Sequence, residues 1–589
     1  MNIDLRANPF FLTEEDCDWV HETIAAMNDE EKVGQLFFQL TSSQKEEDLI
    51  ELIQTYHLGG CRYNPAPARE VWKQNRILQE NSKIPLFIAC NTESGGDGAC
   101  TDGTYIGNGM KIGATGNHDY AEDMGRMGNA EAAAIGCNMA FAPVCDIYYN
   151  PMNTEISTRA FSNDPEMVKK CSVEYVRGAH QNTDFACVAK HFPGNGVDYR
   201  DAHLSNHVND FSPKHWDETY GMVYKELIEN GVEGIMGGHI MLPEYVRELA
   251  PKLPEEEVWM PATLNKTLMT TLLRDKLGFQ GVVVTDASHM VAMTNQMTRK
   301  EMLPRAINAG CDMFLFFNDP QEDFRTMLTA YQRGVISEER MTEALTRILG
   351  IKARLQLHKK SAAEMVPEKD TLDRVLGNEE FKKKQSEISE KSLTLVKYKD
   401  KDVLPISPEK YKKVMIVHIK GHETGMVELL KLCGMEGKNP AETVKQKLCE
   451  RGYDAYVYES PLDQMKQKAL KGEKPDLNIY FSGKNAISEF REQADLVITL
   501  CDVMAGRPSF GMSKGGGEIP WYVFEVPVIA VGCGQPTMLS DIPQVRTYIN
   551  IYDAKENTLE KLIEALSSGA DAFVGKDPID SFCGLQDTK

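Results

Sequence analysis

Residues 185–203 read F-A-C-V-A-K-H-F-P-G-N-G-V-D-Y-R-D-A-H, and the rest of the chain can be interpreted outward from this stretch. The first five residues are apolar or small and predict a short buried strand, which delivers Lys190 and His191 at its end. A proline and two glycines then interrupt the strand, so we expect a mobile loop after it. The stretch therefore predicts a buried strand with basic groups at its carboxyl end.

The loop after this strand ends on Asp201 and His203, which are two residues apart. In an extended segment such residues project to the same side, so the Asp201 carboxylate can hold the imidazole oriented and partly charged. A pair of this kind is suited to donate a proton. Taken alone, however, an Asp-x-His pair also fits a surface loop with unrelated charges, so its meaning depends on the surrounding sequence.

Seven further short apolar runs lie within residues 33–317, and longer helix-like stretches alternate with them. This alternation is typical of parallel β/α units. Together with the strand at 185–191, the runs predict eight strands and an α/β fold of the (β/α)8 TIM-like barrel class, irregular in its first units. The seven runs are 33–40, 59–63, 85–91, 138–147, 234–240, 281–286 and 313–317.

A polar stretch without apolar periodicity follows residue 357, and beyond it a second alternation of strands and helices begins. This second alternation predicts an α/β/α sandwich of about 200 residues. We therefore expect a barrel domain over 1–357, a linker and connecting helix over 358–390, and a sandwich domain over 391–589. The predicted sandwich strands are 414–419, 455–458, 496–501, 526–531 and 547–551.

Composition is that of an ordinary soluble globular protein, with 42% apolar residues, 26% charged residues and a net charge of -22. So negative a surface repels nucleic acid and anionic membranes, and we expect neither as a partner. Asp4 and Arg6 stand where a signal peptide needs an apolar core, and no apolar run could span a bilayer. The 14 cysteines form no C-x-x-C pair. We therefore predict a cytoplasmic protein without a metal site.

Polar residues stand at the ends of the predicted barrel strands, where the active site of such a barrel lies. Carboxylates, several basic groups and several hydrogen-bonding groups are expected to converge on one mouth, a set suited to binding a polyol. They are Asn91 and Glu93 after the third run, Arg159 after the fourth, Lys190 and His191 on the fifth, His239 on the sixth, Asp286 on the seventh, and Asn318 and Asp319 after the eighth.

Each of these residues also has a purely structural interpretation. Asp286 could cap the helix that follows it, and Lys190 and Arg159 could form ion pairs at the rim. His239 could be a hydrogen-bonded imidazole of the core. Their joint position at the strand ends of one predicted barrel favours a shared functional site.

Three segments together resemble glycoside hydrolase family 3, and most closely its NagZ-like β-N-acetylglucosaminidase branch in the two-domain form. The resemblance covers the barrel closely from about residue 85 to residue 318, and the second domain by architecture. The segments are K-H-F-P-G-N-G-V-D-Y-R-D-A-H-L (190–204), P-A-T-L-N-K-T-L-M-T-T-L-L-R-D-K-L-G-F (261–279) and L-G-F-Q-G-V-V-V-T-D-A-S-H-M (277–290).

This resemblance implies that Asp286 is the nucleophile and that His203, oriented by Asp201, is the general acid/base. The implied reaction is a double displacement with retention of configuration, which needs no metal or organic cofactor. The residues that it implies for substrate binding are Lys190, His191, Arg159, Asn91, Glu93 and His239.

Asn91 departs from the pattern of the family, in which the motif D-x-E-G-G usually begins with Asp. An aspartate would repel a substrate carboxylate by about 4 kcal/mol at 4 Å in a partly shielded site, whereas an asparagine would not. A sugar with a carboxylate at C6, a glucuronide, is therefore an alternative substrate. Asn91 could equally keep the same hydrogen bond to a neutral sugar.

A glycine-rich stretch, A-G-R-P-S-F-G-M-S-K-G-G-G-E (505–518), lies between two predicted sandwich strands. It is long enough to be a functional loop. We hypothesise that it leans over the barrel mouth, where Arg507 contacts the acidic or polar end of the sugar. An exposed turn or a homodimer contact would also explain it.

Taken together, the sequence predicts a retaining exo-β-glycosidase that removes terminal β-N-acetylglucosamine from a carbohydrate or glycoconjugate, with β-glucuronidase or β-glucosidase activity as the alternative. A β-glycoside phosphorylase is a different class, in which phosphate replaces water in the second step. A histidine acid/base favours it, because the ring carries no permanent negative charge to repel phosphate. A sugar-binding protein without activity is a third class, and the presence of Asp286 together with the Asp201–His203 pair argues against it.

Overall fold

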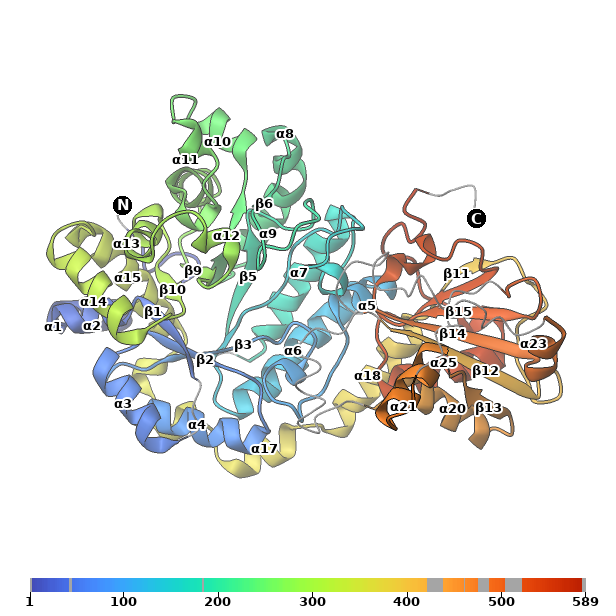
Figure 1. The fold of residues 1–589 in the computed structure, drawn as a ribbon. Helices are drawn as coiled ribbons and strands as arrows, with labels where there is room; N and C mark the ends of the chain where they lie inside the picture. The colour runs from blue at the N-terminus through green and yellow to red at the C-terminus, as the bar shows by residue number, and fades with distance from the viewer. Residues whose placement is uncertain are drawn as a thin grey trace. The chain divides into compact units, whose positions relative to one another are not determined.

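The computed structural model describes residues 3–41, 45–182, 185–420, 438–459, 461–474, 487–503 and 522–584. The chain divides into two compact units (Figure 1). Unit 1 comprises Met1–Gly109 and His118–Lys384, and unit 2 comprises Met110–Asn117 and Gln385–Lys589. Residues 110–117 therefore belong to unit 2 although they lie within the barrel sequence.

Unit 1 is built on a closed barrel of eight parallel strands in the order β1-β10-β9-β7-β5-β4-β3-β2 (Figure 1). Each predicted run overlaps one of these strands, so the predicted barrel is confirmed. The strands are β1 (Phe37–Thr41), β2 (Gly60–Tyr63), β3 (Phe87–Cys90), β4 (Met139–Ala140), β5 (Ala186–Phe192), β7 (Gly234–Gly237), β9 (Val282–Ala287) and β10 (Met313–Leu315).

Helices surround this barrel, and their sequences carry the signals expected at helix ends. For example, α7 (Pro165–Ala179) begins with Asp164 as its N-cap and a proline in its first turn. The other helices of unit 1 with four or more residues are α1 (Glu14–Ala26), α2 (Asp29–Gly34), α3 (Glu46–Tyr56), α4 (Ala68–Glu80), α6 (Asp119–Ala134), α8 (Pro213–Trp216), α9 (Met222–Glu229), α10 (Pro243–Leu249), α11 (Glu255–Val258), α12 (Val291–Thr294), α13 (Arg299–Ala309), α14 (Pro320–Gln332), α15 (Glu338–Arg354), α16 (Ala362–Met365), α17 (Lys369–Val375) and the π-helical segments η3 (Asp217–Gly221) and η5 (Thr267–Lys276).

The barrel interior is filled by side chains, as in other barrels of this size. The ring of Phe38 on β1 lies 5.4 Å from that of Phe141 and 6.2 Å from that of Phe87 on β3. A side chain at Gly60 would collide with the ring of Phe38. These aromatic rings close the barrel below its carboxyl-end mouth and leave that end to polar residues.

Unit 2 contains a six-stranded sheet in the order β11-β16-β15-β14-β12-β13, parallel except for β11. Alternate residues of its strands feed two separate apolar cores, with Ile416 and Ile498 in one and Met415 and Val497 in the other. The sheet is thus covered on both faces, as an α/β/α sandwich requires. The strands are β11 (Thr394–Tyr398), β12 (Lys413–Lys420), β13 (Asp454–Val457), β14 (Leu496–Asp502), β15 (Val528–Gly532) and β16 (Thr547–Asn550); helices include α20 (Pro440–Glu450), α21 (Pro461–Leu470), α23 (Ile487–Gln493) and α25 (Glu556–Ser568).

Two parts of the chain were not anticipated from the sequence. The antiparallel edge strand β11 was missed, and the stretch 358–370 is not an irregular linker throughout. It includes the helix α16 and the start of α17, and the Trp72 Nε1 of α4 donates to the carbonyl of Pro367 at 2.7 Å. The helix α18 (Glu379–Lys391) then spans the division between the units at residue 384.

The segment 110–117 is held in unit 2 by a buried ion pair. Lys111, on α5 (Gly109–Ala114), places its Nζ 2.7 Å from Asp553 Oδ2, 2.6 Å from Thr558 Oγ1 and 3.0 Å from Ser389 Oγ. The Lys111 and Asp553 side chains are 0% and 2% exposed. Among the described residues, no helix of either unit is long and apolar enough to cross a membrane.

Candidate active site

Two cations meet on one carboxylate at the carboxyl end of the barrel. Glu93, after β3, accepts a hydrogen bond from Lys190 Nζ of β5 at 2.5 Å on Oε1. Arg159, from the loop after β4, donates to the same carboxylate through Nε at 2.8 Å and Nη2 at 3.0 Å. Burial would raise the pKa of Glu93, but the Arg159 and Lys190 charges hold it well below its usual value. The cluster is a fixed, ionised platform at the mouth.

Asp286 lies on β9 at the same end of the barrel, with its side chain 17% exposed. Its Oδ1 accepts a hydrogen bond from the Ala287 N–H at 2.7 Å, and its Oδ2 lies 4.0 Å from His191 Nε2. Burial alone would raise the pKa of Asp286, but the charges of His191 and His239 hold it below its ordinary value. The helix α12 begins only at Val291, so Asp286 does not cap it.

A second carboxylate, Asp146, orients His191. Asp146 Oδ2 lies 2.7 Å from His191 Nδ1, and its Oδ1 accepts a hydrogen bond from the Asn195 N–H at 2.7 Å. Because one ring nitrogen is held by Asp146, the other is directed at Asp286. Asp146 was not singled out in the sequence, where it sits inside the apolar run 138–147.

His239 contacts the residue that follows Asp286, and both of its ring nitrogens have protein partners. Its Nδ1 lies 2.8 Å from Thr263 Oγ1, and its Nε2 lies 3.1 Å from the carbonyl oxygen of Ala287. Burial lowers the pKa of His239 below its ordinary value. In this structure the ring is therefore bonded to Ala287 at the end of β9, next to Asp286.

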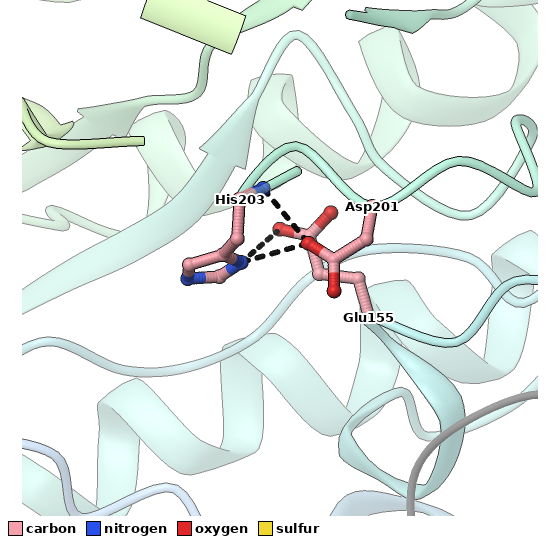
Figure 2. A group of neighbouring side chains, drawn as sticks. All are labelled: Glu155, Asp201 and His203. Carbon is pink, nitrogen blue, oxygen red and sulfur yellow. Dashed lines mark hydrogen bonds and ion pairs between the residues drawn. The ribbon is translucent and has the colours of Figure 1, made fainter. Parts of the chain in front are cut away.

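Asp201 and His203 form a hydrogen-bonded pair on the loop after β5 (Figure 2). Asp201 Oδ1 lies 2.8 Å from His203 Nδ1 and accepts from the His203 backbone N–H at 2.8 Å. That hydrogen bond raises the pKa of His203, and the charges of Asp201, Glu155 and Asp286 add to the effect. The His203 side chain is 52% exposed, and no residue in the described part of the chain bonds to its Nε2, which leaves that atom available to a ligand.

A third carboxylate, Glu155, stands beside this pair (Figure 2). It is 4% exposed, and its Oε1 lies 4.0 Å from His203 Nδ1 while its Oε2 accepts from the Ala202 N–H at 3.1 Å. By donor type and spacing, the trio of Glu155, Asp201 and His203 could hold a cation. The His203 Nδ1 atom already forms a hydrogen bond with Asp201, however. The trio is therefore better suited to holding a proton than a metal cation.

The loop between β5 and Asp201 was predicted to be mobile because of its glycines, and its first part is instead packed tightly. Pro193 to Gly196 are buried, and their carbonyl groups accept hydrogen bonds from Trp216 Nε1 at 2.7 Å and Tyr220 Oη at 2.6 Å. Cβ atoms at Gly194 and Gly196 would lie 2.2 Å from the Tyr220 ring and 1.9 Å from the Ile147 oxygen. The glycines permit close packing here.

The far end of this loop is tied to the segment that follows Asp286. The Val291 and Ala292 N–H groups donate to the carbonyl oxygens of His203 and Ala202 at 3.3 and 3.1 Å. Ala202 also packs against Met290 and Ala292 in a small apolar cluster. The loop that carries His203 is therefore connected to the strand that carries Asp286.

The remaining predicted residues are placed as follows. Asn91 lies just beyond β3, and its Oδ1 is buried without a hydrogen-bond partner among the described residues. Asp319 caps α14 by accepting from the Glu322 N–H at 2.8 Å, so its role here is structural. Arg507 and the glycine-rich stretch around it lie outside the described residues.

Sequence reasoning missed three charged residues of this mouth: Arg62, Asp146 and Glu155. Each had a signal. Asp146 is a lone acid in an apolar run, Glu155 lies four residues before Arg159 in the same motif, and Arg62 stands within the second predicted strand. A charged residue inside a predicted buried strand is unusual enough to indicate a functional position.

Comparison with known proteins shows which family the chain belongs to. The family described as "Glycosyl hydrolase family 3 N terminal domain" matches residues 29–351. The "Beta-N-acetylglucosaminidase/beta-glucosidase" of Cellulomonas fimi is 36% identical over all of this chain and all of its own length. Among solved structures, "Beta-glucoside phosphorylase BglX" has a TM-score of 0.88 at 33% identity, with 99% of both chains covered.

A further solved structure, a family 3 β-N-acetylglucosaminidase from Paenibacillus sp. str. FPU-7, is 25% identical over 94% of this chain and 99% of its own, with a TM-score of 0.76. The family match spans more than half of the chain, and the Cellulomonas fimi relative is similar from end to end. The predicted resemblance is confirmed: this chain is a glycoside hydrolase, and it belongs to family 3.

Proposed function

We propose that the protein is a retaining exo-β-glycosidase that removes a terminal β-N-acetylglucosamine, with Asp286 as nucleophile and His203 as acid/base. The observation that carries the proposal is the contrast between two groups at one mouth. Asp286 has a lowered pKa and is ionised, whereas His203 has a raised pKa and can be protonated near neutral pH. A double displacement needs this combination of a carboxylate and a separate proton donor.

In the first step, an Asp286 oxygen attacks the anomeric carbon and the bond from that carbon to the leaving oxygen breaks. His203 gives its proton to the leaving oxygen and becomes neutral. Lys190, Arg159 and Glu93 supply fixed polar groups for the sugar hydroxyls. Asp146 and His191 hold Asp286 in place and offset its charge until attack.

In the second step, His203 takes a proton from water, the water oxygen attacks the anomeric carbon, and the bond to Asp286 breaks. The sugar leaves with its original configuration. The test is a panel of nitrophenyl β-glycosides, N-acetylglucosaminide, glucoside, glucuronide and xyloside, compared by kcat/KM, with product anomers followed by NMR. Initial release of the α-anomer would overturn the retaining mechanism.

The relatives support the choice of sugar without deciding it. The Cellulomonas fimi relative is named for both β-N-acetylglucosamine and β-glucose, and another, from Pseudoalteromonas piscicida, is a "Beta-hexosaminidase A" at 28% identity over 61% of this chain. We propose N-acetylglucosaminide first and glucoside next. The glucuronide alternative is supported by the uncharged amide of Asn91.

Phosphorolysis is a second candidate, because two observations favour it. The proton donor is an imidazole, which after donation leaves no negative charge to repel phosphate. The solved β-glucoside phosphorylase also covers 99% of this chain. Hydrogen phosphate would attack the anomeric carbon, the bond to Asp286 would break, and the products would be a sugar 1-phosphate and the Asp286 carboxylate. Running the reaction with and without phosphate and assaying sugar 1-phosphate distinguishes the two.

A cytoplasmic location is part of the proposal and is supported by the cysteines. All thirteen that the structure describes are free, and all but Cys449 and Cys583 are buried. Buried thiols of this kind behave as small apolar side chains. The proposed partner is a carbohydrate or glycoconjugate, and whether two copies associate remains a prediction to be measured in solution.

A further inference from the structure

Arg62 is a cation of the barrel that the proposed mechanism does not use. It lies on β2 next to Tyr63, whose hydroxyl donates to the carbonyl of Ala99 at 2.9 Å. Thr41 of β1, in register with Tyr63, bonds to Gln74 of α4 at 3.2 Å. Tyr63 therefore faces the surrounding helices. Because consecutive strand residues point to opposite sides, Arg62 faces the barrel interior.

The guanidinium of Arg62 is near the carboxyl-end mouth. Arg62 is the last but one residue of β2, and its neighbour in register on β3 is Ala89, two residues before Asn91. Burial lowers the pKa of Arg62. The neighbouring Cys90 and Tyr63 oppose that effect first, and the charges of Glu93 and Asp286 add to their opposition. Arg62 thus lies within electrostatic reach of both the platform carboxylate and the proposed nucleophile.

Arg62 has no anionic partner of its own. Its side chain forms no hydrogen bond or ion pair with any residue of the described part of the chain. The nearby Glu93 does not pair with Arg62, since its two oxygens already accept hydrogen bonds from Lys190 and Arg159. The more deeply buried Arg274, in contrast, donates to Asp312 at 2.7 Å. A partly buried guanidinium with five unused donors favours an oxyanion as ligand.

Asn91, just beyond the end of the neighbouring strand β3, has a side-chain acceptor without a partner among the described residues. Asn91 Oδ1 is buried and accepts no hydrogen bond among the residues described. This oxygen has almost no accessible surface, so Asn91 contributes to the corner through the absence of charge on its amide. Asn91 adds no negative charge that would compete with an anion for Arg62.

We propose that Arg62, together with Asn91, forms an oxyanion-binding corner of the active-site mouth. The oxyanion has two possible sources with the same chemistry. It is either the phosphate that accepts the sugar in the second step, or a carboxylate carried by the sugar itself. Arg62 would then determine specificity without taking part in bond making.

Direct binding tests this proposal without any assumption about turnover. Isothermal calorimetry would compare sodium phosphate, sodium glucuronate and the neutral sugar glucose on the full chain. We expect one of the two anions to bind, and Arg62→Gln to weaken it at least about tenfold. Arg62→Lys, which keeps the charge but loses the planar fork, should fall between the two.

A second, kinetic comparison identifies the source of the oxyanion, and it rests on the proposed function. If the anion is the acceptor, Arg62→Gln lowers the ratio of phosphorolysis to hydrolysis. If it belongs to the sugar, the variant lowers the ratio of kcat/KM for the nitrophenyl glucuronide to that for the glucoside. A wild-type protein that cleaves no glycoside would overturn the proposed function, while calorimetry would still decide the role of Arg62.

Arg69→Gln is the matched control, because it removes a positive charge from the same unit at an exposed ion pair with Asp373. Its anion binding should equal that of the wild type. The inference is overturned if neither anion binds the wild type, or if Arg62→Gln weakens glucose as much as it weakens the anions. Thermal unfolding of each variant shows that the comparison is made between folded proteins.

Discussion

His191 Nε2 lies 4.0 Å from Asp286 Oδ2, and this approach links the end of β5 to the end of β9 across β7. Asp146 holds the other ring nitrogen of His191, so the imidazole has one orientation available. A carboxylate that faces a donor of this kind stays ionised despite burial. We have proposed Asp286 as the nucleophile, and a carboxylate whose pKa is held below its ordinary value fits that role.

Asp286→Asn should lower kcat/KM by at least about 1,000-fold, because an amide cannot form the glycosyl ester. Stopped-flow measurement of nitrophenol release should also lose any initial burst. Asp319→Asn is the control, since Asp319 also lies beyond a barrel strand but caps α14, a position that asparagine fills equally well. A variant at position 286 with undiminished turnover would show that the nucleophile has been misplaced.

Asp201→Asn should move the basic limb of the pH profile of kcat/KM to lower pH. The hydrogen bond to Asp201 raises the pKa of His203, and the first step needs the protonated ring. Without that carboxylate the ring loses its proton at a lower pH, so activity falls earlier as the pH rises. A loss of about 10- to 100-fold near neutral pH should accompany the shift. An unmoved limb would assign the titration to another group.

Glu93→Gln should destabilise unit 1 by about 3 kcal/mol, because Lys190 would be left buried, and Arg159 partly buried, without a counter-charge. The folded pKa of Glu93 is depressed, so its stabilising contribution is present above the unfolded value and is lost as the pH falls. The difference between wild type and variant should therefore shrink below about pH 4. Thermal unfolding at several pH values measures it, with the exposed Glu80→Gln as control.

Gly196→Ala should lower both stability and kcat. Gly196 has φ +109°, and an added Cβ would meet the carbonyl oxygen of Ile147 at 1.9 Å, so the turn that leads to the Asp201–His203 pair must shift. Gly334→Ala separates the two causes. That glycine also has a positive φ, +74°, but open space around it, so only backbone strain of about 1–2 kcal/mol should appear. Equal losses in the two variants would contradict the packing argument.

Lys111→Met should destabilise unit 2, because Asp553 would be buried without its cation, at a cost of about 3–5 kcal/mol. The double variant Lys111→Met with Asp553→Leu should recover much of that loss, since an apolar pair can replace a buried ion pair. Chemical denaturation followed by proteolysis within 394–550 measures the unfolding of this unit. No recovery in the double variant would mean that Thr558 and Ser389 depend on the charge.

The barrel could be predicted from the sequence because each strand overlaps a short apolar run, and some of these runs end in polar groups, as at Lys190 and Asp286. Such a pattern depends only on neighbouring residues in the chain, so it can be recognised without knowledge of the fold. The strand β11 was missed because it is an edge strand, and its partly exposed residues Leu395 and Val396 show no continuous apolar run.

The contacts between side chains on different strands of the barrel mouth could not be predicted from the sequence. Nothing near Glu93 reveals that it serves both Lys190 and Arg159, which lie 97 and 66 residues away in the chain. The D-x-H spacing did predict contact between Asp201 and His203, because that pair is local. The proline and glycines do end β5 as predicted, but the sequence did not show that the ring and the carbonyl group that crowd Gly194 and Gly196 come from Tyr220 and Ile147.

The placement of residues 110–117 in unit 2 has a consequence for how this protein can be divided. The polypeptide passes between the units at residues 109–110, 117–118 and 384–385, so no single cut separates them. Deleting everything after residue 384 would leave Lys111 without Asp553 on the remaining fragment. A fragment that ends at residue 384 would therefore carry a lysine that is buried in the full chain but has lost its counter-charge.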